Sequence, residues 1–158
     1  MNRESFGIEV RPARLEDSAV LAQLSSQLGY PLSPTLMSRR LEDVLARVDE
    51  RVLVACRSTD APIGWVHGAE QRFLEADRRC EILGLVVNEA SRRRGIGQRL
   101  VAALEEWAHA RGLTEISVRS NVVRTESHPF YERMGYSRAK TQHVYRKRLM
   151  PPPRGANG

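Results

Sequence analysis

The chain has 158 residues, of which 41% are hydrophobic and 28% charged, so neither a disordered nor a fibrous protein is indicated. Its formal net charge of +6 admits nucleic acid, an anionic surface or a polyanionic cofactor as partners. We find no helix with basic and amide side chains on one face, so no nucleic-acid partner is expected. No apolar stretch approaches the ~20 residues needed to cross a bilayer, and the first residues lack a signal peptide's apolar segment. We therefore expect a cytoplasmic protein without a membrane partner.

Apolar spacing predicts a strand and two helices in the first third of the chain. The strand covers residues 8–14, and the first helix covers residues 17–28. Ser33 followed by Pro34 is typical of an N-cap and a first helical residue, so a second helix begins there. Residues 29–32 form the loop between the helices.

Three β-rich runs and a third helix follow. Residues 52–56 and 63–68 flank a turn-forming segment and indicate a hairpin. Residues 80–87 are almost uninterrupted in apolar side chains, the pattern of a central strand covered on both faces. Apolar residues then recur at helical spacing over residues 96–108, and Gly112 ends that helix.

The last part of the chain predicts a strand at residues 116–121, a short helix at residues 128–134 and one or two strands within residues 136–149. The proline-rich residues 150–158 cannot pack, so we expect a disordered tail. We therefore expect an α/β (α+β) protein with a single domain over residues 1–149.

A basic, glycine-bearing turn joins the third β-rich run to the third helix, with the sequence Arg92-Arg93-Arg94-Gly95-Ile96-Gly97. The first N–H groups of a helix lack internal partners and lie at the positive end of its dipole, so such a turn suits phosphate. Taken alone, an ordinary loop with solvated arginines explains it equally well. The spacing lacks the lysine of a P-loop, and Leu100 stands where a Rossmann turn needs its third glycine.

The turn matches the signature Arg/Gln-x-x-Gly-x-Gly/Ala and follows Leu85-Val86-Val87, and Phe130-Tyr131-Glu132-Arg133-Met134-Gly135-Tyr136 matches Phe-Tyr-x-x-x-Gly-Phe/Tyr. With both motifs, the chain resembles the GNAT superfamily of acetyl-CoA-dependent N-acetyltransferases, over residues 8–149. The resemblance implies the GNAT fold, a central mixed, mostly antiparallel sheet of six to seven strands flanked by about four helices. The expected order is strand, two helices, three strands, helix, strand, helix and two strands.

The resemblance also implies a function: direct transfer of the acetyl group of acetyl-CoA to a primary amine in a ternary complex, with no metal. Main-chain N–H groups of the turn would hold the CoA diphosphate, and the apolar strand before it would pair with the pantetheine arm. The cofactor-binding residues that it implies are Leu85, Val86, Val87, Arg92, Arg93, Arg94, Gly95, Ile96, Gly97, Gln98, Asn121 and Tyr131.

Acetyl transfer needs a neutral amine, stabilisation of an oxyanion and a proton for the departing thiolate. By the resemblance, Tyr131 supplies that proton and the N–H of Val87 stabilises the oxyanion. Glu81, fourteen positions before Gly95, stands where some members carry a general base, and a carboxylate in an apolar stretch suits that task. A solvent-facing glutamate at a strand end is the equal alternative. His128 or water are further candidates for the base.

The acceptor pocket is expected to draw on Tyr30, Pro31 and Leu32, with help from Glu70, Arg72 and Phe73, by family architecture. The acceptor is a small-molecule amine, which we favour, or a protein N-terminus or lysine. A non-catalytic acyl-CoA-binding or sensing module is the alternative from another class. The oligomeric state is left open, although an edge strand near Tyr145 could pair two chains in a homodimer.

Overall fold

The computed structural model describes residues 7–27, 29–58, 60–92, 94–119 and 127–151. Contacts within the chain divide it into two units, residues 1–119 and residues 120–158, and each is described by itself. A single domain over residues 1–149 stays a prediction. None of the helices in the described ranges combines the length and apolar character needed to cross a membrane.

The first unit contains a sheet of five strands, one fewer than the smallest number expected. β1 (Glu9–Pro12), β2 (Glu50–Cys56), β3 (Pro62–Gln71), β4 (Arg79–Val87) and β5 (Ile116–Val118) lie side by side in chain order. Neighbours from β1 to β4 are antiparallel, and β5 is parallel to β4. The middle strand is therefore β3 rather than β4, because β3 follows β2 and precedes β4 through short antiparallel connections.

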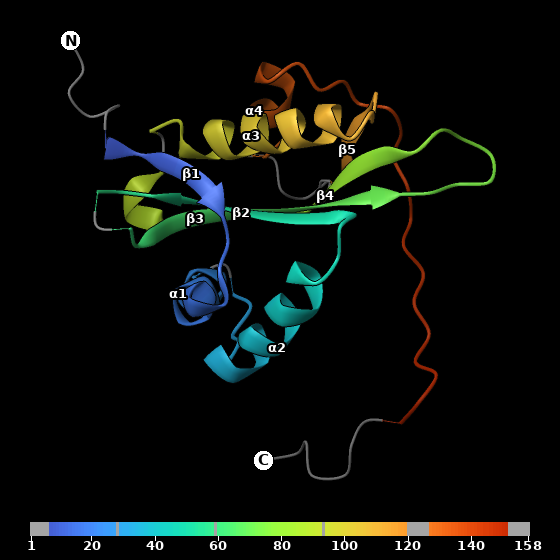
Figure 1. Ribbon diagram of the computed structural model, residues 1–158. Helices are drawn as coiled ribbons and strands as arrows, with labels where there is room; N and C mark the ends of the chain where they lie inside the picture. Colours follow the sequence, from blue (N-terminus) through green and yellow to red (C-terminus); the bar gives the residue numbers. More distant parts are fainter. Residues whose placement is uncertain (1–6, 28, 59, 93, 120–126, 152–158) are drawn as a thin grey trace. The chain divides into compact units, whose positions relative to one another are not determined.

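Two helices, α1 (Ser18–Ser26) and α2 (Pro34–Leu45), cover one face of this sheet (Figure 1). A short 3-10 helix, η2 (Leu15–Asp17), leads into α1. Ser33 caps α2 as predicted, and its Oγ accepts a hydrogen bond from the N–H of Leu36 at 3.1 Å. The helices and strands bury one apolar cluster on this face: Ala13, Leu21, Leu24, Leu41, Val52, Val54, Cys56 and Val86.

The helix α3 (Ile96–Ala110) lies on the opposite face of the sheet (Figure 1). Its Leu100 and Leu104 are fully buried and approach two glycines of β3. A Cβ atom at Gly68 would lie 2.6 Å from the Leu104 side chain, and one at Gly64 would lie 3.2 Å from the Leu100 side chain. Glycine at both positions lets α3 pack closely on β3, which fixes where the N-terminal end of α3 lies.

A charged network ties β1 to η2 and to the turn between β2 and β3. Arg11 donates hydrogen bonds to Asp17 at 2.9 and 3.0 Å and to Asp60 at 2.9 Å. Burial of Asp17 opposes its ionisation, but hydrogen bonds from the Arg11 guanidinium and the Arg14 N–H outweigh it and lower the pKa. The carboxylate is therefore held charged at the start of α1.

The second unit contains α4 (Ser127–Arg133) within its described residues. The helix ends at Arg133, one residue before the predicted end, and Gly135, which was predicted to close it, has a φ of +89°. The strands expected within residues 136–149 are not formed, and residues 137–151 are exposed. Strand propensity reflects packing against a neighbouring strand, and here the described residues supply no such neighbour. The edge strand near Tyr145, on which the expected homodimer depended, is therefore absent from the described part of this unit.

Candidate active site

The strand predicted before the basic turn and the helix predicted after it are both present. β4 ends at Val87, and the 3-10 helix η3 (Glu89–Ser91) follows it. Asn88 caps η3, because its Oδ1 accepts a hydrogen bond from the N–H of Ala90 at 3.0 Å. α3 then begins at Ile96. Arg93 lies outside the described residues.

Gly95 is the N-cap residue of α3 and has a φ of +76°. Residues with a side chain enter this left-handed region at a cost of about 1–2 kcal/mol, which favours glycine. A glycine cap has no side-chain acceptor, so the N–H groups of Ile96, Gly97 and Gln98 stay available to an external partner. These groups lie at the positive end of a helix of 15 residues, an arrangement that suits an anion.

Two of the three arginines of the turn are described, and both lie at the surface. The Nε of Arg92 donates to the carbonyl of Val87 at 3.4 Å, and its Nη1 lies 4.0 Å from the Glu89 carboxylate. The side chain of Arg92 is 44% exposed, and Arg94 is also exposed. Their positive charge adds to that of the helix end, so the turn offers both main-chain donors and cations to a diphosphate.

β4 loses its second neighbour partway along its length. β5 pairs with residues 80–82 and, among the described residues, with none further along β4. The register with β3 shifts at the same place, since Ile82 and Gly84 pair with consecutive residues of β3 and Leu83 is left as a β-bulge. The bulge and the end of pairing coincide, so β4 leaves β5 at this point.

Leu85, Val86 and Val87 lie beyond this bulge and pair with β3 alone in the described part of the sheet. Val86 is buried, and the other two are half-buried. A main-chain edge without a partner strand suits an extended ligand that forms hydrogen bonds as another strand would. The three residues predicted to bind the pantetheine arm therefore form the open edge that leads to the turn.

Glu81 lies next to the place where β4 and β5 separate. It pairs with Ala69 of β3 and with Ser117 of β5. Its side chain is only 13% exposed, and its Oε1 lies 3.0 Å from the Nε of Arg119. The alternative of a solvent-facing glutamate is therefore wrong, and Glu81 is a half-buried carboxylate held by a guanidinium.

Tyr131 lies on α4 in the second unit, within an aromatic group. Its ring contacts those of Phe130 and Tyr136 edge to face, with centroid distances of 5.0 and 5.6 Å. Burial raises the pKa of the Tyr131 hydroxyl. The hydroxyl therefore keeps its proton at neutral pH, as a proton donor requires.

The loop expected to line the acceptor pocket follows α1. Tyr30 is 60% exposed, Pro31 is exposed and Leu32 is half-buried. Gln27, at the end of α1, accepts a hydrogen bond through Oε1 from the N–H of Glu89 at 3.1 Å. This contact holds the start of the loop against η3, directly before the basic turn. The predicted acceptor loop and the predicted cofactor turn are thus on the same side of the unit.

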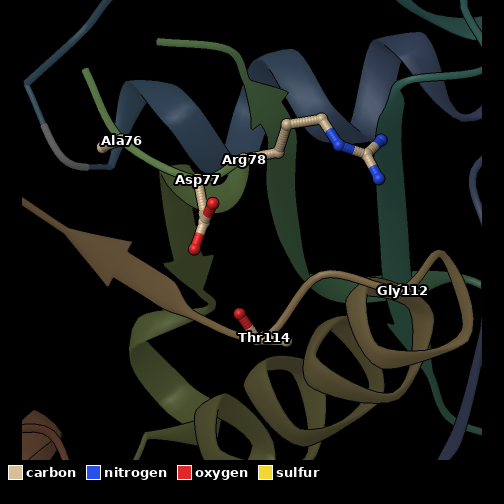
Figure 2. Close-up of a pocket in the computed structure, with 5 residues that line it drawn as sticks. All are labelled: Ala76, Asp77, Arg78, Gly112 and Thr114. Atoms are coloured by element: carbon tan, nitrogen blue, oxygen red, sulfur yellow. The ribbon is translucent and has the colours of Figure 1, made fainter. Parts of the chain in front are cut away.

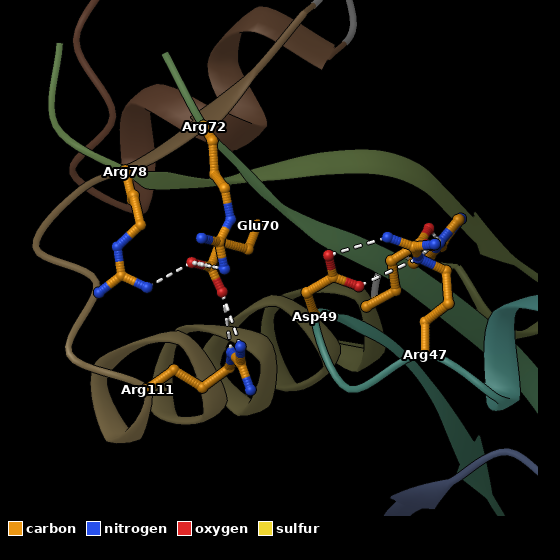
Figure 3. A network of polar contacts seen from close by, with 8 residues as sticks. Arg47, Asp49, Glu70, Arg72, Arg78 and Arg111 are labelled. Atoms are coloured by element: carbon orange, nitrogen blue, oxygen red, sulfur yellow. Dashed lines mark hydrogen bonds and ion pairs between the residues drawn. The ribbon is translucent and has the colours of Figure 1, made fainter. Parts of the chain in front are cut away.

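Glu70, which sequence reasoning associated with the acceptor, is instead an anchor within the fold. Its side chain has no exposed surface, and Arg72 and Arg78 from the connection between β3 and β4 converge on it with Arg111 from the end of α3 (Figure 3). Arg111 donates two hydrogen bonds to its Oε2, at 2.7 and 3.2 Å. Hydrogen bonds from Arg111 and Arg78 lower the pKa of Glu70 against the effect of burial. Phe73 stacks beneath the Arg79 guanidinium at 4.3 Å.

A pocket of about 350 Å³ lies beside the Glu70 cluster, with which it shares Arg78 (Figure 2). Gly112 and Thr114, which line it, follow the C-terminal end of α3, whereas the basic turn precedes the N-terminal end. A helix of 15 residues is about 22 Å long, so the pocket is remote from the turn. The other lining residues are Ala76 and Asp77.

Both cysteines are buried free thiols. Burial raises the pKa of Cys80 to about 11 and also raises that of Cys56. At neutral pH both stay protonated, and a protonated thiol is a poor nucleophile. Neither is therefore suited to carry an acetyl group as a covalent intermediate.

His67 and Glu50 form a contact that sequence reasoning missed. The Nε2 of His67 lies 2.9 Å from the Oε1 of Glu50, and both side chains are about one-fifth exposed. Because the two residues are on adjacent strands and seventeen positions apart, only the register of β2 and β3 reveals the pair. Where the structure is described, no three His, Cys, Asp or Glu side chains are grouped to hold a metal ion. Asn121 lies outside the described residues.

Comparison with known proteins gives a consistent result. The sequence model of the acetyltransferase (GNAT) family matches residues 19–136. The chain is 32% identical to glucosamine 6-phosphate N-acetyltransferase 1 of Oryza sativa subsp. japonica, over 84% of this chain and 83% of the relative. It is 27% identical to aminoglycoside N(6')-acetyltransferase type 1 of Serratia marcescens, over 81% of this chain and 79% of the relative.

Solved structures share the fold at lower sequence identity. Aminoglycoside 6'-N-acetyltransferase AAC(6')-Ih from Acinetobacter baumannii superposes with a TM-score of 0.80 at 18% identity, covering 91% of this chain and 100% of that one. Aminoglycoside N-acetyltransferase AAC(6')-Iy in complex with CoA superposes with a TM-score of 0.79 at 19% identity, covering 89% of this chain and 95% of that one. The predicted fold class is thereby confirmed, although residues 136–149 form no strand.

Proposed function

The chain belongs to the acetyltransferase (GNAT) family, and we propose that it transfers the acetyl group of acetyl-CoA directly to a primary amine, with a small-molecule amine favoured. The reaction takes place in a ternary complex without a covalent enzyme intermediate. One observation carries this proposal. The glycine-capped N-terminus of α3 follows β4 after η3 and the basic turn, and the edge of β4 that faces β5 has no described partner beyond Ile82.

The turn and the open edge of β4 are the proposed cofactor site. Main-chain N–H groups from Arg93 to Gln98 hold the CoA diphosphate, with added charge from the side chains of Arg93 and Arg94. Leu85 to Val87 and Asn121 hold the pantetheine arm. The fold supports this assignment, because the solved N-acetyltransferase with the same fold was in complex with CoA.

The proposed chemistry assigns a separate role to each of three groups. Tyr131 donates its proton to the CoA thiolate as it leaves, and its raised pKa supports that role. Glu81 binds the ammonium form of the acceptor and removes a proton from it, directly or through water. The N–H of Val87 stabilises the tetrahedral oxyanion.

The acceptor is proposed to bind beside the loop of Tyr30, Pro31 and Leu32. The hydrogen bond from Glu89 to Gln27 supports this placement, since it holds the start of the loop near the turn. The names of two relatives refer to an aminoglycoside and to glucosamine 6-phosphate, which are both small molecules that carry amines. That pair favours a small-molecule amine over a protein lysine or N-terminus.

Two measurements on the same preparation test the proposal. CoA should raise the melting temperature, and acetyl-CoA should release free thiol in the presence of aminoglycosides, amino sugars, polyamines or amino acids. Stabilisation by CoA without thiol release for any amine would indicate a non-catalytic acyl-CoA-binding module. Release with peptides alone would indicate a protein acetyltransferase.

A further inference from the structure

One end of the sheet face that carries α1 and α2 is polar. Val52 belongs to the apolar cluster beneath these helices, and it pairs with His67, so His67 projects from the same face. Glu50 pairs with Ala69, which in turn pairs with Glu81. Glu50, His67 and Glu81 therefore lie together on this face, on three adjacent strands.

The His67 ring has a fixed orientation within this group. Its Nε2 bonds to the Oε1 of Glu50 at 2.9 Å, and the Nε of Arg47 lies 2.9 Å from the other carboxylate oxygen. An ionised carboxylate only accepts hydrogen bonds, so Nε2 carries the proton and the lone pair of the neutral ring is on Nδ1. Nδ1 has no hydrogen-bond partner among the described residues.

The charged neighbours of His67 come from two sides. On the β2 side these are Glu50 and Arg47, which also pairs with Asp49. On the β4 side, Gly84 stands directly opposite His67, and Glu81 lies diagonally, engaged by Arg119 at 3.0 Å. Gly84 also adjoins the bulge at Leu83, where β4 leaves β5. His67 is thus next to the carboxylate proposed to meet the amine.

We propose that His67, oriented by Glu50, receives the proton that Glu81 removes from the acceptor amine. The role depends on the acetyl transfer proposed above. One N–H bond of the ammonium held at Glu81 breaks, and its proton passes by way of the Glu81 carboxylate and a bridging water to Nδ1. The electron pair left on nitrogen forms a bond to the acetyl carbon, and the carbonyl π pair moves to oxygen. When that oxyanion collapses, the C–S bond breaks, the CoA thiolate takes the Tyr131 proton, and a second N–H proton replaces the one that Tyr131 gave up. The imidazolium formed at His67 is stabilised by the Glu50 carboxylate. His67 later returns the proton to solvent.

This geometry gives Glu81 and His67 different tasks. Glu81, paired with a guanidinium, is suited to hold the ammonium and pass on its proton, whereas the lone pair of a neutral imidazole is suited to take up that proton near neutral pH. Glu50 acts through His67 and is a positioning residue. The side chain of His67 is 21% exposed, so part of it is open to water.

Thiol release by the full chain with saturating acetyl-CoA and its best amine tests the proposal. His67→Gln should lower kcat near neutral pH on the order of a hundredfold, with the KM for acetyl-CoA unchanged. The defect should shrink as the pH rises, because the amine then loses its proton in solution. Glu50→Gln should show a smaller defect of the same form. His109→Gln, on the exposed side of α3, is the matched control and should equal the wild type.

Melting temperature and the CoA-induced shift show that each variant is folded. An unchanged kcat in His67→Gln, or a kcat defect that is the same at every pH, would overturn the role of His67. The proposed function would still stand in that case, because the unmodified protein turns over. Absence of thiol release in the wild type with every amine would instead overturn the proposed function, and the role of His67 with it.

Discussion

Gln27 at the end of α1 accepts a hydrogen bond from the main-chain N–H of Glu89, at 3.1 Å, across 62 positions of sequence. One side chain thereby joins the connection between the first two helices to the connection that leads from β4 to α3. In the proposed enzyme these connections carry the acceptor and the cofactor. The contact is a physical link between the two proposed substrate sites.

Replacing Gln27 should therefore change acceptor binding. A net hydrogen bond contributes about 0.5–1.5 kcal/mol, so Gln27→Ala should raise the KM for the amine about two- to tenfold. The affinity for CoA should change little, because the turn keeps its own geometry. Gln23→Ala, an exposed position on the same helix, is the control. Equal KM values for the amine in Gln27→Ala and Gln23→Ala would show that Gln27 does not affect acceptor binding.

Gly97→Asp should abolish CoA binding. The substitution places a carboxylate in the first turn of α3, where it would repel the diphosphate and occupy the space next to the free N–H groups. Ala102→Asp adds the same charge to an exposed position of α3 outside the turn, and it should bind CoA normally. The measurement is the CoA-induced shift in melting temperature. Normal binding by Gly97→Asp would refute the turn as the diphosphate site.

Tyr131→Phe should lower kcat on the order of a hundredfold and leave CoA affinity nearly intact, since only the proton donor is lost. Because burial raises the pKa of Tyr131, wild-type activity should resist loss of this proton until the pH passes the ordinary range of tyrosine. The variant should lack that alkaline decline. Tyr145→Phe, at a position 90% exposed, is the control. Unchanged turnover in Tyr131→Phe would exclude the acid role.

Glu70→Ala should lower the free energy of unfolding of the first unit by about 3 kcal/mol at pH 7. This value is at the lower end of the range for breaking a buried ion pair, because the arginine side chains remain partly exposed. The folded state lowers the pKa of Glu70, so its contribution is present above the unfolded value of about 4.3. It is lost as the pH falls through the lower folded value.

Urea unfolding at pH 7 and below pH 4 measures both effects. The wild type should lose more stability than Glu70→Ala between the two conditions. Glu75→Ala, which removes an exposed carboxylate from the nearby loop, is the control and should follow the wild type. An identical pH dependence of Glu70→Ala and the wild type would contradict the anchor.

The two cysteines should react with a thiol reagent only after unfolding. Burial raises the pKa of Cys56 and Cys80, so the reactive thiolate is scarce below the ordinary thiol pKa and the native fold blocks access. Titration of the native and the urea-unfolded protein with the reagent of the thiol-release assay checks this. Rapid reaction of either native thiol would contradict it and would reopen a covalent intermediate.

Much of the fold could be predicted because its signals are local. Ser33 and Pro34 marked the start of α2, and Gly112 marked the end of α3, since caps depend on neighbouring residues. The expected strands at residues 136–149 failed for the opposite reason. Their alternation is a local property, but a strand forms only with a partner, and sequence pattern does not supply one.

The sequence by itself determined the turn from Arg92 to Gly97, because a strand end, a left-handed glycine and a helix start are contiguous in the chain. Only the tertiary structure decided which side chains meet. Arg111 reaches Glu70 across 41 positions, and His67 reaches Glu50 across 17. Such contacts depend on strand register and on the packing of α3, where a shift of one residue turns a side chain to the other face of the sheet.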